Sequence, residues 1–125
     1  MNIQPIDSVV FKYSSPLKTL YKKGKLSSVK FGFYGDEITP KNVTIEHLKC
    51  VSNKGKTTLN NIVLASANKN QERGNRPLSE MLNWEYAGRY LEQFRDVKVK
   101  GFDGNKYIEM ILDTIKGLLQ NEGMV

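Results

Sequence analysis

The chain has 125 residues, and its 19 Lys and Arg against 13 Asp and Glu give a formal net charge of +6. This length suits one domain with a modest core, residues 1–125, and excludes two independent ones. The single cysteine, Cys50, excludes an internal disulfide, and the lack of a secretory signal or of an apolar run long enough to span a membrane favours a soluble, cytoplasmic protein.

The positive charge is uneven along the chain. Residues 1–76 contain 13 Lys and Arg against 5 Asp and Glu, a net charge of +8, whereas the 6 basic and 8 acidic residues of 77–125 give −2. We divide the chain into a basic N-terminal segment (1–42), a central segment (43–77) and a C-terminal helical cover (78–125). An anionic partner is therefore expected to meet the first two segments.

The basic N-terminal segment is expected to contain one short helix. Ser15 and Pro16 are typical of a helix start, as the cap and the first helical residue, and Gly24 is typical of a helix end. Lys18 and Lys22 lie one turn apart on this helix. They are either solvated or in contact with phosphate groups.

The central segment begins after an aromatic stretch, residues 31–34, which we interpret as an irregular strand or loop with core rings. Glycine and proline then indicate a turn over 35–42. A short strand is predicted at 43–47 and a second at 61–65, with a polar loop between them at 48–60.

Helices are predicted for the rest of the chain. The first covers 66–73 and ends at Gly74, and two longer ones cover 78–94 and 105–120. The apolar residues of the two longer helices recur at helical spacing and are expected to cover the core: Leu78, Met81, Leu82, Tyr86, Tyr90, Phe94, Ile108, Ile111, Leu112, Ile115, Leu118 and Leu119. A homodimer seam on the last helix is the alternative.

The residues that suggest chemistry lie in the central segment. Glu46 and His47 end the first predicted strand, Asn61 comes fourteen residues after His47, and Asn70 comes nine residues after Asn61. A histidine with an ordinary pKa near ~6.5 can take a proton from water. Glu46 and Asn70 carry the oxygen ligands that a hard cation prefers. Because neighbouring side chains of a strand point to opposite faces, Glu46 and His47 can reach one metal centre only if the backbone bends there.

This order and spacing resembles the HNH (His-Me finger, ββα-metal) endonuclease family, in the H-N-N form of small stand-alone proteins of phages and mobile elements. The resemblance covers residues 43–77. It implies an α+β fold with a ββα-metal core, a basic N-terminal helical segment and two C-terminal helices. It also implies Mg²⁺ or Mn²⁺ and nicking or cutting of DNA.

The resemblance also implies a role for each residue of the motif. His47 would be the general base, Glu46 and Asn70 the metal ligands, and Asn61 a brace for the loop that holds the histidine. Two positions depart from the family pattern, since Glu46 stands where aspartate is commoner and Cys50 where proline is common. We expect Cys50 to be a small buried residue.

Phosphate contacts are expected from basic side chains around the motif. On the helix over 66–73, Arg73 shares a face with Asn70 and suits either a phosphate or an ordinary salt bridge. Lys54 and Lys56 lie in the loop between the strands. The full set of expected nucleic-acid contacts is Arg73, Lys54, Lys56, Lys18, Lys22 and Arg76.

Two other functions remain open at this point. A non-cleaving factor on the same scaffold would bind DNA or a protein through its basic half, with salt-sensitive affinity and no need for metal. The second open function is an enzyme that acts on RNA or on a structured nucleic-acid junction. The sequence has no separate recognition module such as a helix-turn-helix or a zinc finger, so a protein partner or the shape of the nucleic acid would supply specificity.

Overall fold

The structure is a computed structural model that describes residues 16–123, so the predicted cap Ser15 lies outside the described residues. In the described part, five α-helices accompany two small antiparallel sheets of two strands each. The α+β class predicted from the sequence is therefore confirmed. None of the helices in this part of the chain is both long and apolar enough to cross a membrane.

A hairpin of two strands lies at the centre of the fold. β1 (Val43–His47) pairs with β2 (Ile62–Ser66) along its whole length, from Val43 opposite Ser66 to His47 opposite Ile62. Every residue of β2 is buried, as expected for a strand covered on both faces. The first strand has the predicted bounds, and the second begins one residue later than predicted.

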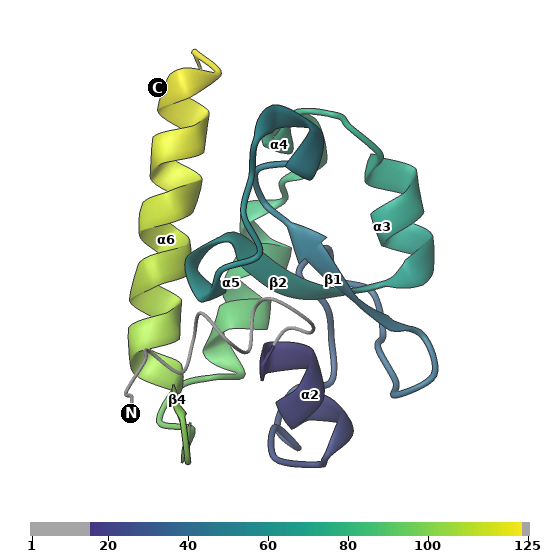
Figure 1. Cartoon of the computed structure of the whole chain (residues 1–125), viewed down its shortest axis with the longest axis vertical. Helices are drawn as coiled ribbons and strands as arrows, with labels where there is room; N and C mark the ends of the chain where they lie inside the picture. Colours follow the sequence, from purple (N-terminus) through teal and green to yellow (C-terminus); the bar gives the residue numbers. More distant parts are fainter. Residues whose placement is uncertain (1–15, 124–125) are drawn as a thin grey trace, which may run out of the picture.

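Helix α3 (Ala67–Arg73) follows β2 without a loop. The Ser66 side chain caps it by accepting a hydrogen bond from the Lys69 backbone N–H at 3.2 Å, and Gly74, with a φ of 54°, ends it. Figure 1 shows the β1–β2 hairpin between α3 on one side and α6 (Gly104–Asn121) on the other. The order strand, loop, strand and helix in the central segment agrees with the prediction.

The far side of the hairpin is held by buried aromatic residues. The Leu64 backbone N–H donates to the Tyr90 hydroxyl at 3.0 Å, the Tyr90 and Tyr107 hydroxyls lie 2.9 Å apart, and the Tyr107 hydroxyl donates to the Ile62 carbonyl at 2.8 Å. Tyr90 and Tyr107 also pack edge-on against Phe94, with ring centroids 5.0 and 4.9 Å away. This network joins β2 to α5 (Trp84–Glu92) and α6, and its buried hydroxyl groups have hydrogen-bond partners.

The prediction of one continuous helix over 78–94 is wrong, because the structure has two helices there. α4 (Leu78–Met81) stops where Leu82 turns extended, and Asn83 then caps α5 (Trp84–Glu92) by accepting a hydrogen bond from the Tyr86 N–H at 3.0 Å. An asparagine that bonds local backbone competes with a continuous helix. The apolar spacing alone gave no sign of this break.

The last helix agrees with its prediction to within one residue at each end. Its apolar stripe is turned inward, and Ile111, Ile115 and Leu119 are buried in the core of this chain. A short hairpin that precedes the helix was not predicted: β3 (Lys98–Val99) pairs with β4 (Phe102–Asp103). Strands of two residues are too short for a periodic pattern to form.

At the start of the described chain, α2 (Pro16–Lys22) confirms the predicted basic helix. It packs through the fully buried Leu17, and Gly24, with a φ of 77°, follows its end. Most of the aromatic stretch after it is also core, as predicted, since Phe33 and Tyr34 are buried while Phe31 is half exposed.

Candidate functional site

His47 is the last residue of β1, and its imidazole is partly buried under the loop that follows. Its Nε2 lies 2.8 Å from the hydroxyl oxygen of Thr57, which comes from the far part of that loop. Burial, together with the nearby charge of Arg73, lowers the pKa of His47 from its ordinary value of 6.5. The imidazole is therefore neutral at pH 7, the form that can accept a proton.

Asn61 closes the loop between β1 and β2. Its Oδ1 accepts from the Lys49 backbone N–H at 2.9 Å, and its Nδ2 donates to the carbonyls of Lys49 and Lys56 at 3.1 and 2.9 Å. The side chain is only 7% exposed. One amide thus joins both arms of the loop, which is the bracing role that the family resemblance implies for Asn61.

Gly55 lies where the two arms of the loop come closest. Its backbone N–H donates to the Cys50 carbonyl at 2.9 Å, and a Cβ built on it would lie 1.7 Å from the carbonyl oxygen of Lys49. Since that oxygen belongs to backbone held by Asn61, it cannot move aside without opening the loop. The position therefore requires glycine for close approach of two backbone segments.

Replacing Gly55 with alanine is expected to lower the free energy of unfolding by about 1–3 kcal/mol, the usual cost of overpacking, by forcing the two arms of the loop apart. Urea unfolding followed by circular dichroism measures this. Gly88→Ala is the matched control, because a Cβ there meets nothing within 4 Å. Equal stability of the Gly55 and Gly88 variants would contradict the expectation.

Asn70 is fixed by α3 against the outer edge of β1. Its Nδ2 donates to the Ile45 carbonyl at 2.9 Å and to the Thr44 hydroxyl at 3.1 Å. A carbonyl can only accept, so the amide nitrogen must face β1 and the amide oxygen Oδ1 faces away from it. Asn70 is therefore anchored with an oxygen turned outward, two residues along β1 from His47.

Glu46 lies in the interior of the protein, and its side chain does not share a partner with His47. The strand stays paired through His47, so no bend brings the two side chains to one face. Glu46 is 5% exposed, its Oε2 accepts from the Tyr34 hydroxyl at 2.6 Å, and the Arg73 guanidinium lies 3.4 Å from the same oxygen. Burial raises the pKa of Glu46, and the contacts with Tyr34 and Arg73 oppose that shift.

Arg73 is a structural clasp, and the expected phosphate contact is wrong for the described arrangement. The side chain is 2% exposed, and its two Nη atoms donate to the carbonyls of His47 and Leu48 at 2.7 and 2.6 Å. Its Nε donates to the Arg76 carbonyl at 2.9 Å. With these donors used inside the protein, the guanidinium fixes the backbone on which His47 sits.

The chain after α3 also packs on the loop. The Cys50 Sγ lies 3.7 Å from the Gly74 carbonyl, and the Ser52 hydroxyl donates to Asn75 Oδ1 at 3.2 Å. Cys50 is buried, as predicted from its small size and its lack of a second thiol. The loop is thus held from α3, from its own arms and from Asn61.

The other basic residues of the prediction lie apart from this cluster or on its surface. Lys54, Lys56 and Arg76 are exposed, and the first two belong to the braced loop. Lys18 and Lys22 lie on α2, at the other end of the molecule from α4 in Figure 1, and are not brought together with His47.

Sequence reasoning missed three residues of the site. Tyr34 was assigned to the core because of its aromatic ring. The signal that could have found its contact with Glu46 is its hydroxyl, because the hydroxyl of a buried tyrosine usually needs a hydrogen-bond partner. Thr57 and Gly55 were part of a loop described as polar. Nothing in the local pattern indicated that Thr57 contacts the histidine or that Gly55 allows the loop to close.

Of the two predicted metal ligands, Asn70 presents an oxygen of the kind that a hard cation prefers. Mg²⁺ needs only one or two protein oxygens and keeps its other waters. Asn70 Oδ1 is turned outward, whereas Glu46 is buried, with Oε2 in contact with Tyr34 and Arg73 and with a further hydrogen bond to its carboxylate from the His47 backbone. Comparisons of this chain with protein-family models, with curated proteins and with solved structures found no match.

Proposed function

We propose that this protein is a metal-dependent endonuclease of the HNH type that hydrolyses phosphodiester bonds of DNA, with residues 43–73 as a ββα-metal unit. One observation carries the proposal. Asn61 and Asn70 both bind the backbone around His47, at Lys49 and Ile45, two residues to either side of it. Three residues that match the family motif in sequence thus converge on one strand end.

In this proposal His47 removes the proton from the attacking water. In the tautomer that this role requires, Nε2–H donates to the Thr57 hydroxyl and the lone pair on Nδ1 is left for the water. The lowered pKa keeps the ring neutral before the reaction. The closed loop, held by Asn61 and Gly55, fixes the ring relative to β1.

Asn70 Oδ1, at the outer edge of β1, would hold the cation together with the buried carboxylate of Glu46. A bound Mg²⁺ or Mn²⁺ supplies positive charge to the phosphate and to the leaving oxygen. In-line displacement has the attacking and leaving oxygens on opposite sides of phosphorus. A base under the loop and an amide oxygen at the edge of the strand suit such a division.

Substrate binding is assigned to exposed basic side chains, with a low intrinsic preference for sequence. Lys54 and Lys56 are the first choice, because they lie just before Thr57, the residue that contacts His47, and Arg76, Lys18 and Lys22 are secondary. A protein partner or the shape of the DNA would then supply specificity.

A second candidate function is a non-cleaving DNA-binding factor on the same scaffold. The observation that favours it is the buried contact of Glu46 with Tyr34 and Arg73, which removes one carboxylate oxygen from the proposed metal site. Such a factor would bind DNA in EDTA with the same affinity as in Mg²⁺. It would leave supercoiled DNA intact.

The proposal is tested by cleavage of supercoiled plasmid with Mg²⁺, with Mn²⁺ and with EDTA. We expect nicking with either metal and none in EDTA. Asn70→Ala is expected to weaken the apparent affinity for Mg²⁺ by roughly 10- to 100-fold, the effect typical of a disturbed metal site. Asn68→Ala, an exposed change on the same helix, is the control. Binding of DNA without cleavage under every metal would favour the second candidate.

A further inference from the structure

An open groove of about 340 Å³ runs between the loop after β1 and the C-terminal half of α6. Three lysines line it on the loop side, Lys49, Lys54 and Lys56, and all three are exposed. The α6 side contributes Thr114 and Asn121, which are uncharged. Positive charge and neutral hydrogen-bonding groups are what a phosphate backbone requires of a protein surface.

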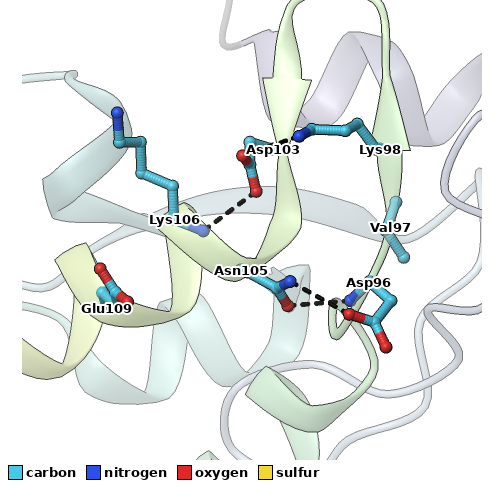
Figure 2. Close-up of a pocket in the computed structure, with 7 residues that line it drawn as sticks. All are labelled: Asp96, Val97, Lys98, Asp103, Asn105, Lys106 and Glu109. Carbon is cyan, nitrogen blue, oxygen red and sulfur yellow. Dashed lines mark hydrogen bonds and ion pairs between the residues drawn. The ribbon is translucent and has the colours of Figure 1, made fainter.

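The absence of acidic residues from the lining distinguishes this groove from another pocket of the described residues. The pocket in Figure 2, of about 450 Å³, lies at β3, β4 and the start of α6 and mixes both signs of charge. There Lys98 lies 3.5 Å from Asp103, and Asp96 and Glu109 add further negative charge. The acidic groups offset the positive charge of the lysines in that pocket, whereas no acidic residue of the lining offsets the three lysines of the groove.

The groove and His47 share one segment of the loop, residues 56–58. Lys56 and Thr58, which line it, are the chain neighbours of Thr57, whose hydroxyl contacts the His47 ring. Asn61, which braces the loop, lines it as well. A DNA strand with one phosphate at His47 would therefore need to cross only the loop segment 56–58 to enter the groove.

On the α6 side of the groove, one of the lining residues is a glycine, which adds no side chain to the groove. Thr114 donates to the Asn60 carbonyl at 2.6 Å, so α6 is fixed against the loop. Gly117, one turn further on, lines the groove, and a Cβ there would meet nothing within 4 Å. Internal packing therefore does not require the glycine, although glycine is unfavourable inside a helix relative to alanine. Its effect is to leave the groove open.

We propose that this groove binds the phosphates of the DNA strand that flanks the bond at His47, with Lys49, Lys54 and Lys56 as the contacts and Gly117 as the gap that admits the strand. The inference rests on the proposed function for the position of the bond, but its binding step needs neither metal nor cleavage. It adds Lys49 and α6 to the surface that meets nucleic acid.

The first test uses two glycine replacements that add the same side chain to different helices. Gly117→Glu adds an extended, negatively charged side chain inside the groove, and Gly88→Glu adds one on the exposed surface of α5, where a Cβ also meets nothing within 4 Å. Both variants change the net charge equally. Fluorescence anisotropy with labelled single-stranded and duplex DNA in EDTA measures binding, and thermal unfolding checks both folds.

We expect Gly117→Glu to weaken binding about tenfold more than Gly88→Glu does, since a fixed negative charge replaces space for a phosphate. Equal affinities of the two variants for both DNA forms would overturn the inference. So would a native protein that binds neither form. Native protein that binds DNA through the groove but never cleaves it would refute the nuclease and leave the groove, so the two failures can be told apart.

A second test removes the lysines. Lys49→Gln, Lys54→Asn and Lys56→Gln are combined, with asparagine at 54 because that residue has a φ of 70°. The triple change Lys98→Gln, Lys100→Gln and Lys106→Gln removes equal charge from the β3–β4 hairpin and the start of α6. The groove variant should lose about 2 units from the slope of log affinity against log salt, as expected for three phosphate contacts with a single strand. Equal slopes in the two triple variants would overturn the inference.

Discussion

Arg73→Met is expected to lower the free energy of unfolding by about 3–5 kcal/mol, the cost of leaving one member of a buried ion pair without its partner. The Glu46 carboxylate would remain in the interior without its cationic partner. The carbonyls of His47 and Leu48 would also lose their donors. Urea unfolding at pH 7.5, followed by circular dichroism and fluorescence, measures the loss.

The pH dependence of this variant identifies which part of the loss comes from Glu46. Burial raises the pKa of Glu46, and removing the guanidinium raises it further. A native state with a raised carboxyl pKa binds protons more tightly than the unfolded chain, so its stability is greatest at low pH and is lost as pH rises through that pKa. The deficit of Arg73→Met relative to native protein should therefore shrink at pH 5.

A double variant separates the ion pair from the carbonyl contacts. Arg73→Met combined with Glu46→Leu removes the unpaired charge but not the unsatisfied carbonyls, so it should recover only part of the stability. Arg95→Met is the control, because Arg95 is exposed and its ion pair with Glu92 lies on the surface. A loss for Arg73→Met no larger than that of the control would contradict the role of Arg73 as a clasp.

His47→Ala is expected to reduce kcat/KM for plasmid nicking by about 10²- to 10⁴-fold, the contribution typical of a general base. The change removes the base but leaves Asn61, Asn70 and the loop backbone in place. Nicking under saturating Mg²⁺ measures the loss, with Asn53→Ala, an exposed change in the same loop, as the control. Full activity of His47→Ala would exclude the assigned mechanism.

The pH profile of the native protein gives an independent check on His47. Only the neutral ring can act as a base, and burial together with the charge of Arg73 lowers its pKa below 6.5. Since kcat/KM falls as pH drops through this pKa, the acid limb should have its midpoint below pH 6.5. A midpoint above that value would indicate a different base, or an environment that favours the charged ring.

Local patterns in the sequence determined most of the elements of the fold. The strand at 43–47 and the helix over 105–120 were placed to within a residue, because alternation and helical spacing of apolar side chains are local signals. The spacing of His47, Asn61 and Asn70 also identified the residues that converge at the end of β1. Such signals depend on neighbours within a few positions of the chain.

The tertiary structure decided which partners the charged residues take. Glu46 and Arg73 are 27 positions apart, and nothing local indicates that they meet in the interior with Tyr34. The sequence therefore left Arg73 open to a phosphate and Glu46 open to a metal. The groove between the loop and α6 depends in the same way on the contact of Thr114 with Asn60, 54 positions away. Contacts at such separations depend on how the elements pack, which the pattern within any one element does not contain.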